Sequence, residues 1–149
     1  MINFYLDIET IPCQSPEYRG KVRDTIKPPG NIKKPESILQ WIEENADSAA
    51  DEAVAKTSFD PAHGHICCIG FAVDDGKPQY YEARSLEDER ALLENFFGNM
   101  PTMGLARFIG HNVSGFDLRF IICRSIVLGV RIPTLFPRDI KPWSQDIFD

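Results

Sequence analysis

The hydrophobic stretch at residues 2–9, INFYLDIE, decides how the rest of the chain is interpreted. If it is a strand, Tyr5, Asp7 and Glu9 lie on one face and the apolar residues on the other. The Cα atoms of Asp7 and Glu9 would then be roughly 6.5–7 Å apart, so both carboxylates can reach one divalent cation or bridge two. Carboxylates beside an apolar strand are costly unless water or a cation neutralises them. The stretch predicts a metal site, and a strand that runs into a solvated acidic turn is the alternative.

Length and composition fit one globular domain with its own core, since the 149 residues are 43% hydrophobic and 26% charged. No apolar run is long enough for a membrane span and no signal peptide is recognisable, so we expect no membrane partner. The four cysteines lack metal-binding spacing, which favours reduced thiols and a cytoplasmic location. The net charge of −6 argues against binding nucleic acid by bulk electrostatics. An enzyme whose bound metals neutralise an acidic centre remains compatible with it.

Hydrophobic periodicity and turn residues predict an α/β fold with a mixed sheet flanked by helices. Strands are expected at about 2–8, 66–73, 78–83 and 107–110, and helices at about 35–56, 85–98 and 115–128. Proline-rich surface loop is expected at 12–34, and an extended tail from 131 onward. We therefore expect a single domain over residues 1–149, with a helical insertion at about 12–60.

A second motif, HNVSGFD at residues 111–117, follows the predicted fourth strand and opens the last helix. Asp117 falls in the first turn of that helix, where the helix dipole favours a carboxylate. An ordinary helix start capped by Asn112 or Ser114 would account for the same residues. The motif alone therefore leaves both interpretations open.

Together, the two motifs resemble those of the DEDD superfamily of 3′–5′ exonucleases. Residues 7–10, DIET, are similar to its first motif, Asp-x-Glu on the first strand. Residues 109–120, IGHNVSGFDLRF, are similar to the second motif of the predicted exonucleases related to the proofreading domain of family B DNA polymerases. The resemblance spans most of the chain and implies a ribonuclease H-like fold that hydrolyses phosphodiester bonds at the 3′ end of DNA.

By this resemblance, Asp7, Glu9 and Asp117 are the catalytic metal ligands. Asp7 would bridge two Mg²⁺ or Mn²⁺ ions, Glu9 would bind one and orient the attacking water, and Asp117 would bind the second through water. Carboxylates suit these hard cations, which prefer oxygen ligands. A metal pair of this kind activates water and clamps the scissile phosphate.

The resemblance also implies residues that contact the nucleic acid. Thr10 and Asn112 would hold the terminal nucleotide, and Phe116 would pack beneath the site. The expected substrate is a single-stranded DNA 3′ end, and RNA is not excluded because the motifs do not fix contacts to the 2′-OH. A related ribonuclease or endonuclease is an alternative function.

The sequence departs from the family pattern because a third motif, Tyr or His four residues before an Asp on a late helix, is absent. The acids that follow Asp117 are Asp139, Asp146 and Asp149, in a proline-rich tail. We expect either a C-terminally truncated exonuclease or a short natural protein that binds metal or nucleic acid without cutting. A truncated domain would expose apolar surface, which favours a homo-oligomer.

Two groups of basic residues have alternative interpretations. Residues 19–34 carry six Lys and Arg against one Asp, which suits either contact with a phosphate backbone or a solvated loop. Arg119 and Arg124 on the last predicted helix lie either near the proposed site or toward solvent.

Overall fold

The computed structural model describes residues 1–100, 106–137, 140–141 and 147–149. Its strands are β1 (Ile2–Ile11), β2 (His65–Val73), β3 (Gln79–Glu82), β4 (Ala106–Ile109) and β5 (Ile147–Phe148). Its helices are α1 (Pro16–Thr25), α2 (Pro35–Ala55), the short 3-10 helix η1 (Lys56–Phe59), α3 (Asp88–Gly98) and α4 (Asp117–Leu128). None of these helices is both long enough and apolar enough to cross a membrane.

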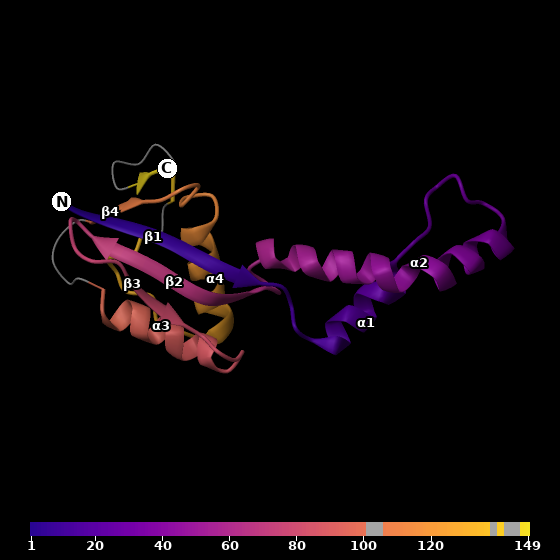
Figure 1. The fold of residues 1–149 in the computed structure, drawn as a ribbon, viewed down its shortest axis with the longest axis horizontal. Helices are drawn as coiled ribbons and strands as arrows, with labels where there is room; N and C mark the ends of the chain where they lie inside the picture. Colours follow the sequence, from indigo (N-terminus) through magenta and orange to yellow (C-terminus); the bar gives the residue numbers. More distant parts are fainter. Residues whose placement is uncertain (101–105, 138–139, 142–146) are drawn as a thin grey trace.

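The strands form one five-stranded mixed sheet in the order β3-β2-β1-β4-β5 (Figure 1). β2 is antiparallel to both β1 and β3, whereas β4 runs parallel to β1 and β5 runs parallel to β4. The predicted α/β class with a mixed sheet is therefore confirmed.

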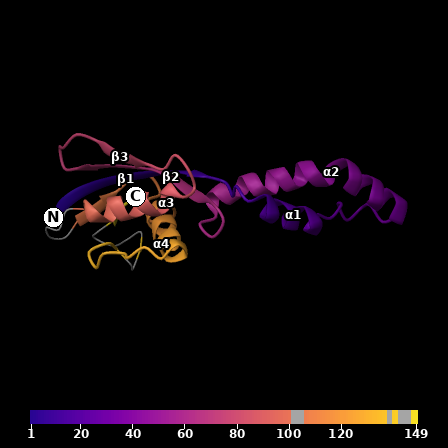
Figure 2. The ribbon, with the colours of Figure 1, turned by 90° about the horizontal axis from the view of Figure 1, so that it is seen from below.

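The core lies on one face of this sheet, beneath α3 and α4 (Figure 2). The alternation predicted for β1 is present, because Phe4, Leu6 and Ile8 are buried on that face. Phe4 is central to the core, with ring centroids of Phe96 and Phe108 at 6.2 and 5.3 Å. In the described part of the chain, no helix packs on the opposite face of the sheet.

Residues 12–34 differ from the expected loop because they contain helix α1. Ser15 caps its N-terminus by accepting a hydrogen bond from the backbone N–H of Tyr18 at 3.2 Å. Pro16 occupies the first turn, where a missing N–H costs nothing. The local abundance of proline concealed these start signals in the sequence.

The other differences are at the ends of strands. β1 extends to Ile11, three residues beyond its predicted end, and the two-residue strand β5 falls in the predicted tail. The tail residues Asp139 and Asp146 lie outside the described residues.

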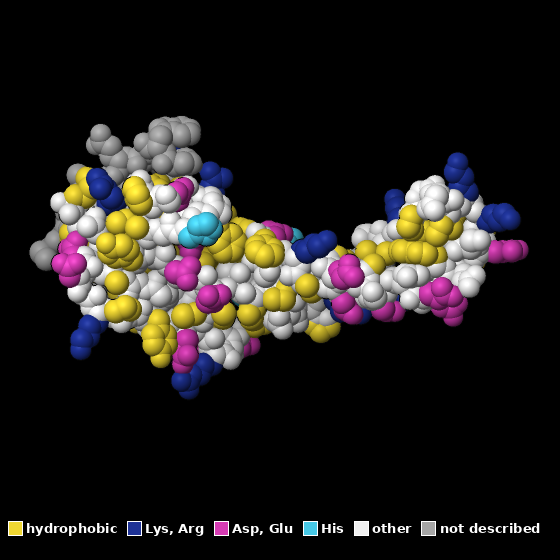
Figure 3. Space-filling model, turned by 45° about the horizontal axis from the view of Figure 1, so that its top comes forward, with side chains coloured by type: hydrophobic (Ala, Val, Ile, Leu, Met, Phe, Trp, Pro, Cys, Tyr) yellow, Lys and Arg dark blue, Asp and Glu magenta, His cyan; other side chains and the backbone are white. Residues whose placement is uncertain are grey.

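Helices α1 and α2 form an antiparallel arm that projects from the sheet (Figure 1). Arg19 pairs with Asp51 at 2.5 Å and with Asp47 at 3.4 Å, and Arg23 pairs with Asp47 at 3.0 Å. These two arginines therefore bind the arm's own acids. Lys and Arg side chains also gather at the far end of the arm (Figure 3).

Candidate metal centre at the edge of β1

Asp7 and Glu9 lie on the open face of the sheet, where both side chains are exposed. Across the antiparallel pair, Asp7 is opposite Gly70 and Glu9 is opposite Cys68. The register shifts directly after Glu9, so the strand is irregular at the end of the motif. The two acids thus share a face, as the period of a strand requires.

Asp117 reaches the same strand because β4 is short. β4 pairs with β1 only up to Tyr5, which leaves the following edge of β1 without a strand partner on that side. Instead, the backbone N–H of Ile8 donates a hydrogen bond to Oδ1 of Asp117 at 2.9 Å. The carboxyl group of the second motif therefore lies at the amide between Asp7 and Glu9.

A tight turn between β4 and α4 delivers Asp117 to this position. Gly110 is required because a Cβ atom there would lie 2.5 Å from the carbonyl oxygen of Leu6. Asn112 has a left-handed φ of 50°, a conformation that Asn tolerates better than most residues. Its carbonyl accepts the N–H of Phe116 at 2.9 Å, which closes the turn before the helix begins.

One further acid of this region, Asp149, is not predicted to lie near the motifs, because it falls in the predicted extended tail. Strand β5 places it beside the turn, where its Oδ1 accepts the backbone N–H of Ser114 at 2.9 Å and its Oδ2 accepts the Ser114 hydroxyl. Partial burial opposes ionisation of Asp149, but these hydrogen bonds outweigh it and lower its pKa. A two-residue strand is too short to be recognised from periodicity.

The environment of Asp117 disfavours its charge. Its side chain is only 3% exposed, and burial raises its pKa to about 6. The charges of Asp7 and Asp149 add to this increase, while backbone N–H groups, including that of Ile8, oppose it. Among the described residues, no Lys or Arg forms an ion pair with Asp7, Glu9 or Asp117.

Asp117 reaches the backbone between Asp7 and Glu9, but the three carboxylates do not form a finished metal site. Within the described ranges, no three His, Cys, Asp or Glu side chains are grouped so that they could hold a metal ion. Oδ1 of Asp117 accepts the hydrogen bond from Ile8, so the backbone already uses part of the hydrogen-bonding capacity of this carboxylate. The donor types fit Mg²⁺ or Mn²⁺, because all three are carboxylates.

The residues expected to contact nucleic acid occupy three different environments. The hydroxyl group of Thr10 donates to the carbonyl of Ser58 at 2.8 Å, which ties β1 to η1. Asn112 is exposed on the turn. Phe116 is half-buried, with the rings of Phe120 and Phe59 at 5.3 and 6.2 Å.

A hollow of about 610 Å³ adjoins Asp7 on the open face. Its lining includes Tyr5, Asp7, Gly70, Tyr80 and His111. Gly70 lies between Asp7 on β1 and Tyr80 on β3, and because it has no side chain the hollow is deeper at this point. Hydrophobic and acidic side chains lie together on this face of the molecule (Figure 3).

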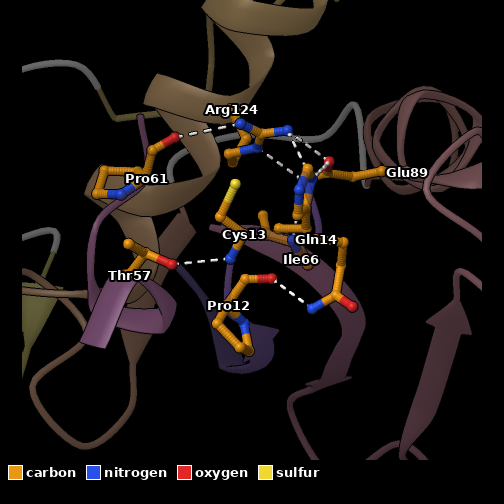
Figure 4. Close-up of polar contacts among 9 residues, drawn as sticks. Pro12, Cys13, Gln14, Thr57, Pro61, Ile66, Glu89 and Arg124 are labelled. Atoms are coloured by element: carbon orange, nitrogen blue, oxygen red, sulfur yellow. Dashed lines mark hydrogen bonds and ion pairs between the residues drawn. The ribbon is translucent and has the colours of Figure 1, made fainter. Parts of the chain in front are cut away.

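A second polar cluster lies on the covered side of the sheet, around Glu89 and Arg124 (Figure 4). These side chains are 1% and 3% exposed, and Arg124 donates to both carboxylate oxygens, at 2.8 and 2.6 Å. The backbone N–H of Ile66 donates to Glu89 at 2.8 Å, and Nδ1 of His65 lies 3.1 Å from it. Arg124 is therefore a buried structural residue, and the alternative that it faces solvent is wrong.

Hydrogen bonding decides the charge of Glu89. Burial pushes its pKa upward, but the contacts from Arg124, Ile66 and His65 outweigh burial and lower the pKa. Every buried side-chain nitrogen and oxygen of this cluster has a hydrogen-bond partner, so no buried donor or acceptor is left for a ligand.

Comparison of the chain with protein-family models, with curated proteins and with solved structures gives no match in any of the three.

Proposed function

We propose that this chain is a metal-dependent 3′–5′ exonuclease domain of ribonuclease H-like fold that acts on DNA ends. The observation that carries the proposal is the 2.9 Å hydrogen bond from the Ile8 amide to Asp117. It joins the second motif to the first at the point between Asp7 and Glu9. The mixed sheet, with an antiparallel hairpin on one side of β1 and parallel strands on the other, supports the proposed fold.

The uncompensated charge of the three carboxylates supports a cation at this site. Asp117 is buried beside Asp7 with no Lys or Arg partner among the described residues, and its charged form is unfavourable there unless a cation compensates it. Asp7, Glu9 and Asp117 would hold Mg²⁺ or Mn²⁺, and two such ions would supply the activated water and the charge stabilisation for phosphodiester hydrolysis.

The chain's other residues would position the DNA. The hollow next to Asp7 offers room for a nucleotide, with Tyr80 available to contact a base. The Thr10 hydroxyl donates to Ser58, so toward a nucleotide it can only accept a hydrogen bond. The exposed side chain of Asn112 has both a donor and an acceptor to offer.

The first test is to incubate a 5′-labelled single-stranded DNA with the protein and Mn²⁺. We expect a ladder that shortens from the 3′ end. Asp7→Asn should slow it by about a thousandfold or more, since loss of about 4 kcal/mol of transition-state stabilisation has that effect. The matched control is Asp75→Asn, an exposed acid of the β2–β3 turn, which should keep the wild-type rate.

Other outcomes identify the alternatives. Internal cuts would favour an endonuclease, and a ladder that persists in Asp7→Asn would indicate a contaminating nuclease. Binding without cleavage would favour a non-catalytic nucleic-acid-binding module. That module is the second candidate because no three described acids enclose a metal position.

A second test addresses the hollow. Gly70→Val should fold, because an added Cβ would meet only the carbonyl oxygen of Asp7, at 3.8 Å. The new side chain would fill part of the hollow between Asp7 and Tyr80, so the KM for DNA should increase by about tenfold. Gly98→Ala is the control, since a Cβ there meets nothing within 4 Å. An unchanged KM would place the DNA elsewhere.

A further inference from the structure

We infer that Asp149 is a positioning residue of the candidate centre, which holds Asp117 against β1 by fixing the turn that contains Ser114. The contacts are direct at the first step: Oδ1 of Asp149 accepts the Ser114 backbone N–H at 2.9 Å, and Oδ2 accepts the Ser114 hydroxyl. The catalytic consequence of this positioning role rests on the proposed exonuclease function, but the structural consequence does not.

The turn transmits this anchor to the start of α4. Val113 and Ser114 are 0% and 2% exposed, so the segment that Asp149 grips is fully packed. The Val113 carbonyl accepts the N–H of Leu118 at 3.0 Å, which fixes the residue next to Asp117. The turn is therefore linked to α4 immediately beside the carboxyl that binds the Ile8 amide.

Strand β5 supplies the rigid side of the anchor. Its Phe148 pairs with Ile109, and the Phe148 carbonyl accepts the N–H of Gly110 at 3.2 Å. The turn is thus attached to β5 at its first residue and again at Ser114. A charged acceptor holding two donors of one residue is among the stronger hydrogen-bond arrangements.

The geometry favours positioning over metal ligation. Both carboxylate oxygens of Asp149 are engaged by Ser114, whereas Asp7 and Glu9 have no such partner in the described residues. Asn is a discriminating replacement, because its carbonyl can accept the backbone N–H and its amide can donate to the Ser114 oxygen. An Asn at this position would keep the anchor but would be a poor ligand for Mn²⁺.

The test compares Asp149→Asn, Asp149→Ala and Ser114→Ala by two measurements. The first is amide hydrogen exchange at Ile8, read by NMR without metal, with the amides of β2 as internal controls. Asp149→Ala should speed exchange at Ile8 by about tenfold, which is the scale of one lost hydrogen bond. Ser114→Ala should have a smaller effect in the same direction, and Asp149→Asn should have none.

The second measurement is the affinity for Mn²⁺, by calorimetric titration. Asp149→Ala should weaken binding by about 10- to 100-fold, the usual cost of losing a residue that orients a ligand. Asp149→Asn should bind nearly as tightly as the wild type.

Two results would overturn the inference. Unchanged exchange at Ile8 in Asp149→Ala would show that Asp149 does not position Asp117. Equal loss of Mn²⁺ affinity in the Asn and Ala variants, with Ile8 still protected in Asp149→Asn, would make Asp149 a ligand instead. Failure of the exonuclease proposal is separately visible, because a wild type that neither binds Mn²⁺ nor cuts DNA can still show the exchange effect at Ile8.

Discussion

Helix α4 carries two buried charged residues, Arg124 and Asp117, whose neighbours differ in charge. Arg124 meets Glu89 and the pair is closed, with both side chains nearly inaccessible and every polar atom satisfied. Asp117, two turns earlier, is equally buried but lies beside Asp7 and Asp149, which carry the same charge. Burial raises the pKa of the carboxyl group in both clusters, but hydrogen bonds from Arg124, Ile66 and His65 bring that of Glu89 below its usual value, whereas nothing reverses the increase at Asp117. The first cluster is thus a compensated ion pair, whereas the second contains a buried acid without a counter-charge among the described residues.

The two clusters should respond oppositely to pH. The pKa of Glu89 is lowered, so its contribution to stability is present above its unfolded pKa and is lost as pH falls through the folded value. The pKa of Asp117 is raised from 3.8 to about 6. Relative stability from Asp117 is therefore present below pH 3.8 and is lost as pH rises through about 6.

The largest effect is expected from breaking the buried Glu89–Arg124 ion pair, which we call the closed cluster. Arg124→Met should lower the free energy of unfolding by about 3–5 kcal/mol, because Glu89 would remain buried without its counter-charge. Urea denaturation measures this loss. The control is the double variant Glu89→Leu with Arg124→Met, which removes both charges and should recover most of the stability. A loss below about 1 kcal/mol in the single variant would contradict a closed structural pair.

Removing a charge from the acids Asp7, Asp117 and Asp149, which we call the open cluster, should have the opposite effect on stability. Asp117→Asn should raise the free energy of unfolding at pH 8 without divalent ions by up to about 3 kcal/mol, since it removes a charge whose pKa is raised by about two units. It keeps an oxygen that can accept the Ile8 N–H. Thermal or urea denaturation at pH 4 and pH 8 gives the measurement, and Asp75→Asn is the control. Destabilisation at pH 8 would show that the buried charge is already compensated.

Divalent ions should stabilise one cluster and leave the other unchanged. At ten times its dissociation constant, Mn²⁺ should raise the free energy of unfolding at pH 8 by about 1.4 kcal/mol. The increase should disappear in Asp7→Asn and persist in Glu89→Leu with Arg124→Met. Stabilisation that survives Asp7→Asn would place the bound ion outside the candidate centre.

The smallest effect is expected at the edge of the closed cluster. His65→Ala should cost about 1 kcal/mol, the usual value of one hydrogen bond, because Glu89 keeps its contacts with Arg124 and Ile66. The side chain of His65 is 19% exposed, so water can replace part of the contact. A loss of stability similar to that of Arg124→Met would mean that His65 compensates the charge of Glu89 as much as Arg124 does.

Sequence patterns predicted the parts of this fold that depend on neighbouring residues. The alternation along β1 put Asp7 and Glu9 on one face because a strand has a period of two. The position of Asp117 at the start of a helix followed from the motif and the apolar run after it. These are local properties, and the structure has both.

The features that the sequence did not predict depend on contacts between distant residues. Glu89 and Arg124 are 35 residues apart, and nothing in either helix identifies the partner of the other. Asp149 reaches Ser114 through a strand of only two residues.

The early end of β4 has a consequence for how this fold could change. Lengthening β4 by two residues would offer the Ile8 amide a main-chain carbonyl as partner, and the acid at the start of α4 would then be displaced. Such an insertion would make the sheet more regular, but it would remove the hydrogen bond between the Ile8 amide and Asp117 that joins the two motifs. The length of β4 therefore determines whether Asp117 can reach the Ile8 amide.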